Sequence, residues 1–178
     1  STLQVVDSAY AQYRFDLASQ ALYDFVWNEL CDWYLELSKP VLWDEETNPM
    51  AALGTRQTLI TVLEQSLRML HPFMPYLTEE IWQSVSPFAG TQSDSIMLAP
   101  WPTYSAEQID EESESEIEWL KKIIIAIRTI RAEANIPPST ELTVLVSHAS
   151  EQDKARLIRN AAYLAKLAKV SQLQALSP

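Results

Sequence analysis

The sequence predicts a mainly α-helical protein: an antiparallel helix bundle followed by a small α/β subdomain. Two observations predict this fold class. Apolar residues recur every three or four positions over long stretches, and one alternating, β-branched segment occurs late in the chain. With 178 residues, 47% of them hydrophobic, the chain can bury a core. We expect the bundle at residues 1–106, with a boundary loop at 86–106, and the α/β subdomain at 107–178.

The first predicted helix runs from about Asp16 to Ser38 and ends at Pro40, because proline cannot donate a backbone hydrogen bond inside a helix. Its apolar residues recur at helical spacing: Ala18, Leu22, Phe25, Val26, Leu30, Trp33 and Leu37. Another face carries a polar row, either a solvated surface or a binding face, made of Asp24, Asn28, Asp32 and Glu36.

Two further helices complete the predicted bundle. Thr55 is expected to cap the second helix, which is stopped by Pro72 and Pro75. The third helix is expected to begin at Thr78 and to turn Trp82 inward. The bundle therefore consists of helices that pack side by side.

The second unit is predicted to consist of a helix, a strand and further helices. Residues 115–134 form a wide apolar arc and end before the sequence Asn-Ile-Pro-Pro. Residues 142–147 alternate and are β-branched, which predicts a strand with Leu142, Val144 and Val146 on its core face. Residues 151–168 are again helical in pattern.

Composition excludes several classes of function. The chain has only two glycines, so it contains no glycine-rich phosphate loop or dinucleotide fingerprint. Cys31 has no cysteine or histidine at ligand spacing, and no nucleophile motif occurs. No apolar run approaches the length of a membrane span. We therefore expect no catalytic residue, no metal site and no membrane partner.

Charge is distributed unevenly along the chain. The net charge is −11, but residues 119–178 carry 9 basic and 4 acidic side chains, whereas residues 1–118 carry 4 basic and 20 acidic ones. This asymmetry indicates different roles for the two units.

Six segments, in family order and spacing, carry a resemblance to a known family. They are YRFD at 13–16, ALY at 21–23, WNELCDWYLE at 27–36 followed by Lys39-Pro40, HPFMPYLTEEIW at 71–82, PWP at 100–102 and IRTIRAEANIPP at 127–138. Together they resemble the anticodon-binding domain of the valyl-tRNA synthetase family, of class I. The proline-rich segment is shared more loosely with the leucyl and isoleucyl enzymes.

The resemblance implies the anticodon stem-loop of tRNA(Val) as partner. It also implies a cytoplasmic, monomeric ligase that joins valine to its tRNA using ATP and magnesium, with catalytic and editing domains elsewhere in the same polypeptide. Neither nucleotide signature, His-x-Gly-His or Lys-Met-Ser-Lys-Ser, occurs here, so we expect this region to hold no cofactor and to be non-catalytic. A first helix before Ser1 and a basic coiled coil after Pro178 are expected from the family.

The end of the long helix combines the residue types that an anticodon reader needs. Unstacked bases are recognised by flat apolar surfaces and by groups that bond to base edges. Valine anticodons share A and C as their last two bases, and a carboxylate can accept a hydrogen bond from cytosine N4. We expect Glu36, or alternatively Asp32, to accept from a base edge, Leu35 and Pro40 to form a platform, and Lys39 to meet phosphate.

Two arginines of the second unit have separate predicted roles. Arg128 lies at the edge of the apolar arc and is expected to contact tRNA. Arg131 falls inside the arc, where an arginine is rarely buried without partners. We expect Arg131 to tie its helix to the bundle through a carboxylate or backbone carbonyls.

Three alternatives stay open at this stage. Glu36 and Lys39 can be a simple surface pair at i, i+3 spacing. The domain can belong to an isoleucyl or leucyl enzyme instead. A helical module that orders neighbouring domains, without RNA, would suit the acidity.

Overall fold

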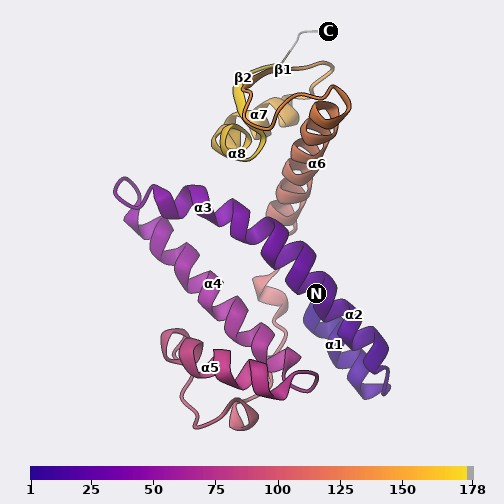
Figure 1. Ribbon diagram of the computed structural model, residues 1–178, viewed down its shortest axis with the longest axis vertical. Coiled ribbons are helices and arrows are strands. Elements are labelled where there is room, and N and C mark those ends of the chain that lie inside the picture. Colours follow the sequence, from indigo (N-terminus) through magenta and orange to yellow (C-terminus); the bar gives the residue numbers. More distant parts are fainter. Residues whose placement is uncertain (176–178) are drawn as a thin grey trace. The chain divides into compact units, whose positions relative to one another are not determined.

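The computed structural model describes residues 1–175, and the chain divides into two compact units, Ser1–Glu107 and Gln108–Pro178 (Figure 1). The first unit is helical and the second combines helices with a small sheet. The predicted fold class is therefore confirmed.

The first unit is built from helices α1 to α5. Figure 1 shows α2 and α3 as parts of one long rod, from which the chain turns back into α4. The bounds are α1 Thr2–Ala11, α2 Phe15–Tyr23, a π-helical stretch Asp24–Tyr34, α3 Leu35–Trp43, α4 Pro49–Leu70 and α5 Pro75–Ala89, with a 3₁₀ turn at Ile96–Leu98. Along the chain, α1 contacts α2, α3 contacts α4 and α4 contacts α5.

The prediction that the long helix ends at Pro40 is wrong. Pro40 lies inside α3, which continues to Trp43. An interior proline costs a helix about 3 kcal/mol in local terms. Leu37 and Ser38 are buried on α3, which packs against α4, and this packing offsets the local cost.

Two predicted helix starts are also corrected. Helix α4 begins at Pro49, where the side chain of Asn48 accepts a hydrogen bond from the backbone N–H of Ala51 at 3.2 Å, so Thr55 is not the cap. Helix α5 begins at Pro75 instead of Thr78. Both prolines occupy the first helical position, where the missing N–H would have no partner in the helix anyway.

Helix α1 was not predicted, and the predicted boundary loop begins later than expected. Val6 and Ala9 of α1 are buried, and Val6 packs with Leu22 and Met69. Helix α5 runs through Pro87 to Ala89, so the first residues of the 86–106 segment are helical. Gly90, with φ of +74°, ends α5 in a left-handed conformation.

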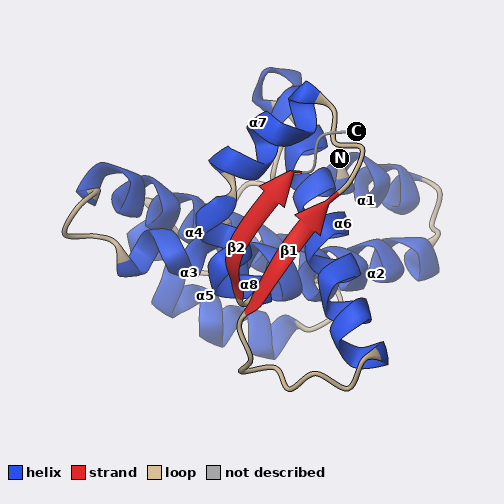
Figure 2. Cartoon of the chain, turned by 90° about the horizontal axis from the view of Figure 1, so that it is seen from above, coloured by secondary structure: helices blue, strands red, loops and turns tan. Residues whose placement is uncertain are grey.

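In its described part, up to residue 175, the second unit pairs a two-stranded sheet with three helices, α6 Glu111–Glu133, α7 Glu151–Arg159 and α8 Ala161–Ala168. A 3₁₀ turn, Ala106–Gln108, precedes α6. Figure 2 shows strands β1 (Leu142–Val146) and β2 (Val170–Ala175) side by side, and they are parallel. The register pairs Leu142 with Val170 and Val144 with Leu173.

The prediction of β1 is confirmed, since Leu142, Val144 and Val146 are less exposed than the residues between them. Strand β2 was not predicted. The helical pattern expected at 151–168 is confirmed, and it forms two helices separated at Asn160.

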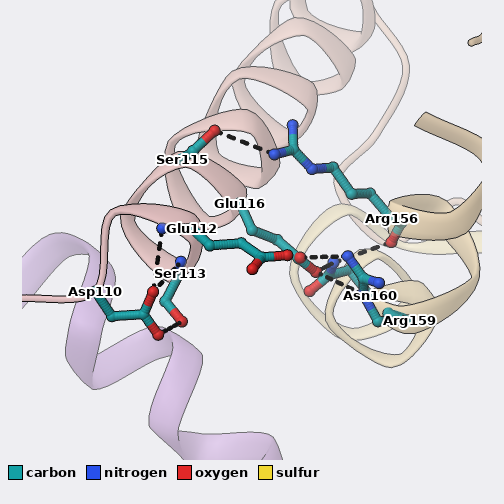
Figure 3. A network of polar contacts seen from close by, with 8 residues as sticks. All are labelled: Asp110, Glu112, Ser113, Ser115, Glu116, Arg156, Arg159 and Asn160. Carbon is teal, nitrogen blue, oxygen red and sulfur yellow. Dashed lines mark hydrogen bonds and ion pairs between the residues drawn. The ribbon is translucent and has the colours of Figure 1, made fainter. Parts of the chain in front are cut away.

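A polar network joins the start of α6 to the end of α7 (Figure 3). Glu116 accepts hydrogen bonds from Arg159 Nε at 3.1 Å and from Asn160 Nδ2 at 2.7 Å. These two bonds hold the pKa of the Glu116 carboxyl below its usual range. Nearby, the Ser113 hydroxyl donates to Asp110 and lowers the pKa of that carboxyl in the same way. Asn160 itself lies between the two helices, as the C-cap of α7 and the N-cap of α8.

Candidate nucleic-acid interface

Five of the six predicted RNA-binding residues lie on one continuous helical rod. Asp32 belongs to the π-helical stretch, and Leu35, Glu36, Lys39 and Pro40 belong to α3. The structure therefore brings these side chains together on consecutive turns of one element.

The end of this rod is accessible within the described chain. Leu35 is 39% exposed, and the side chains of Glu36 and Lys39 are 40% and 43% exposed. Asp32 is also exposed, and Pro40 is half-buried. The neighbouring Leu37 and Ser38 are buried, so one face of α3 serves packing while another faces solvent.

Glu36 and Lys39 form an ion pair across one helical turn. This is the surface pair that the sequence left open as an alternative. Because both partners are substantially exposed, such a pair contributes only about 0–1 kcal/mol to stability. A base edge or a phosphate can therefore exchange with either partner at small cost.

Pro40 removes one backbone donor from this part of α3. In an α-helix the backbone N–H of residue 40 would donate to the carbonyl of Glu36, but proline has no N–H. Glu36 thus carries both a carboxylate and a backbone carbonyl that lacks its usual helical donor. Both groups are of the kind that accept from the amino groups of bases.

Sequence reasoning missed an exposed aromatic pair on the same rod. Tyr23 and Trp27 are stacked, with ring centroids 6.3 Å apart and planes 6° apart, and both are more than half exposed. They border an apolar groove of about 280 Å³ that Phe73 and Met74 also line. Their i, i+4 spacing was the available signal, and flat exposed rings of this kind can stack on bases.

Arg128 lies on α6, in the second unit, whose position relative to the first unit is not determined. It is exposed and donates from Nη2 to the backbone carbonyl of Leu167 at 3.1 Å. The structure therefore does not join Arg128 to the five residues of the rod.

Arg131 bonds to backbone carbonyls, as predicted, but not to those of the bundle. Its Nη1 donates to Ala168 at 3.2 Å, and its Nη2 donates to the carbonyls of Pro137, Pro138 and Thr140 at 2.8, 3.1 and 2.5 Å. All four carbonyls belong to the second unit. Arg131 therefore closes the α/β fold on itself, and the prediction that it ties α6 to the bundle is wrong.

Within residues 1–175, no group of histidine, cysteine and carboxylate side chains could hold a metal ion. Across the same part of the chain, every helix is too short or too polar to cross a bilayer.

Comparison with known proteins agrees with this geometry. The family model described as "Anticodon-binding domain of tRNA ligase" matches residues 1–146. A protein of Coxiella burnetii (strain RSA 493 / Nine Mile phase I), named valine–tRNA ligase, is 46% identical over 173 residues, which are 97% of this chain and 19% of that protein. The chain thus spans about a fifth of the length of this relative. The match covers the rod that carries Asp32, Leu35, Glu36, Lys39 and Pro40, and the chain belongs to the family of anticodon-binding domains of tRNA ligases.

Proposed function

We propose that this chain is the anticodon-recognition domain of a valine–tRNA ligase. It binds the anticodon stem-loop of tRNA(Val) and positions that tRNA for ATP-dependent aminoacylation by catalytic and editing domains of the same cytoplasmic, monomeric protein. The name and identity of the relative support the amino acid, and the exposed end of the rod supports the role. The 178 residues contain no signature for ATP and magnesium, so the chemistry is assigned to those other domains.

The single observation that carries the proposal is the exposed group formed by Leu35, Glu36 and Lys39 on α3. Glu36 accepts from N4 of the cytosine that ends the valine anticodon, and uracil lacks this donor. Leu35 and Pro40 support an unstacked base, while Lys39 leaves Glu36 for a phosphate. Asp32, one turn earlier, is the second candidate for the base edge.

A titration at low salt tests the proposal. The parent chain is compared with Glu36→Ala, using stem-loops whose anticodon ends in cytosine or in uracil. We expect the parent to prefer cytosine, and Glu36→Ala to lower that preference about tenfold, which corresponds to about 1.4 kcal/mol.

Glu80→Ala is the matched control, because Glu80 is an exposed carboxylate on α5. Loss of any negative charge strengthens RNA binding in general, so both variants should gain affinity for every loop. Only Glu36→Ala should change the ratio between cytosine and uracil. An unchanged ratio would remove Glu36 from the reading role.

Titration with whole transcripts of valine, isoleucine and leucine tRNAs tests which amino acid the parent enzyme uses. Preference for isoleucine or leucine tRNA would place the chain in one of those enzymes. Failure to bind any of the three would leave the non-RNA interaction module as the better explanation.

A further inference from the structure

The second unit contains a basic pocket of about 440 Å³ that the anticodon-reading model does not use. Its cationic lining consists of Arg128 and Arg131 from α6 with Lys166 and Lys169 from the end of α8, and Ile136 and Pro138 contribute apolar surface. None of the described residues that line it is acidic or aromatic. Such a pocket stands out in a chain with a net charge of −11.

Part of this cationic set has a structural role. Arg131 is only 7% exposed and its guanidinium is bonded to four backbone carbonyls. One of them, Ala168, is the last residue of α8, where the carbonyl ends of the helix attract positive charge. Arg131 therefore shapes the inner wall of the pocket and supplies positive potential.

The rim of the pocket presents three exposed cations. Arg128, Lys166 and Lys169 are all exposed. Lys169 adopts a left-handed conformation, with φ of +53°, which ends α8 and starts β2 beside the pocket. The fold thus gathers three cations from two elements around one concavity.

We propose that this rim binds the phosphodiester backbone of the tRNA. The inference rests on the proposed function, since the RNA is the one that the first unit would read. Lysine ammonium groups and the guanidinium of Arg128 are suited to phosphate oxygens. The described lining offers no aromatic ring for stacking and no carboxylate for a base amino group, so the contact is to phosphate and independent of sequence.

The test compares two double variants of the whole 178-residue chain. Lys166→Gln with Lys169→Gln removes two charges from the rim. Lys122→Gln with Lys154→Gln removes two charges from the same unit outside the pocket lining. Affinity for a whole tRNA transcript is measured over a range of salt concentrations, and circular dichroism verifies folding of each variant.

We expect the rim variant to lose about tenfold in affinity at low salt. We also expect it to lower the slope of log K against log salt by about 1 to 2, because each phosphate contact adds about 0.7–0.9 to that slope. The loss should be equal for transcripts with a valine anticodon and with a mutated anticodon. The Lys122/Lys154 variant should change affinity less than twofold.

Three results overturn the inference while leaving anticodon reading intact. The first is an equal change in tRNA affinity in the two double variants. The second is a loss of affinity confined to the transcript with the valine anticodon. The third is that inorganic phosphate stabilises the parent but not the rim variant, while both bind tRNA with equal affinity. The last result would assign the pocket to a small anion. If the parent chain binds no tRNA, the inference and the proposed function fall together.

Discussion

The indole Nε1–H of Trp82 donates a hydrogen bond to Oε1 of Glu64 at 2.7 Å, and both side chains are buried. The other carboxylate oxygen of Glu64 accepts from Arg68 Nη2 at 2.7 Å and from Nε at 3.1 Å. Arg68 Nη1 donates in turn to the backbone carbonyl of Pro100. One buried carboxylate therefore links α4 to α5 and, through Arg68, to the segment that follows α5.

Arg68→Met should destabilise the first unit by about 3–5 kcal/mol, because it leaves Glu64 charged and buried without its cation. Urea unfolding monitored by tryptophan fluorescence measures this loss. Arg56→Met is the control, since Arg56 pairs with Glu45 on the surface and should cost less than about 1 kcal/mol. Equal losses in the two variants would contradict the role assigned to Glu64.

Arg131→Met and Arg131→Lys should both destabilise the second unit by about 2 kcal/mol or more. Methionine leaves four carbonyls without their donor, and a lysine ammonium cannot reproduce the planar fork that reaches them. Thermal unfolding by circular dichroism provides the measurement, with Lys122→Met on the same helix as control. If Arg131→Lys melted at the same temperature as the parent, the planar fork of the guanidinium would not be needed for stability.

The second unit should lose stability in acid through Glu116. Hydrogen bonds from Arg159 and Asn160 lower the pKa of this carboxyl in the folded state, so the unfolded state binds more protons at mildly acidic pH. The stabilisation is complete above the unfolded pKa, about 4.3, and is lost as pH falls through the lower folded value.

Glu116→Gln should therefore flatten the dependence of the melting temperature on pH as the pH falls below about 5. Glu118→Gln is the matched control on the same helix, because Glu118 is 57% exposed and pairs across one turn with Lys121. If Glu116→Gln and the parent respond to pH identically, the network in Figure 3 does not contribute to acid sensitivity.

Pro40→Ala should raise the stability of the first unit and weaken RNA binding. Alanine restores the N–H that can donate to the Glu36 carbonyl, which favours the helix by about 1–3 kcal/mol. The same change removes the rigid ring proposed as a platform and occupies an acceptor beside the proposed base site. Urea unfolding and titration with the anticodon stem-loop, carried out on the same protein preparation, measure the two effects. If Pro40→Ala is more stable but binds RNA as tightly as the parent, Pro40 is not part of the interface.

Local patterns were sufficient for part of this protein. The helical period predicted the long rod, and the alternation of residues 142–147 predicted β1, because each depends on which face of one segment is apolar. The end of the rod was predicted to be a candidate site because residues 32–40 lie close together in sequence. Because one helical rod carries all of these residues, they stay close together whatever the rest of the fold is.

Tertiary structure decided the rest. Pro40 continues the helix because α3 packs on α4, and β2 exists because Val170 and its neighbours pair with a strand distant in the sequence. The acceptors of Arg131 and the partner of the Asn160 side chain likewise depend on groups brought close only by folding. Sequence by itself determined which segments have an apolar face and which carry the candidate RNA-binding residues, since those properties are local. Only the fold determined where proline is tolerated, which strand pairs and which carbonyls a buried guanidinium meets, because these depend on contacts between distant segments.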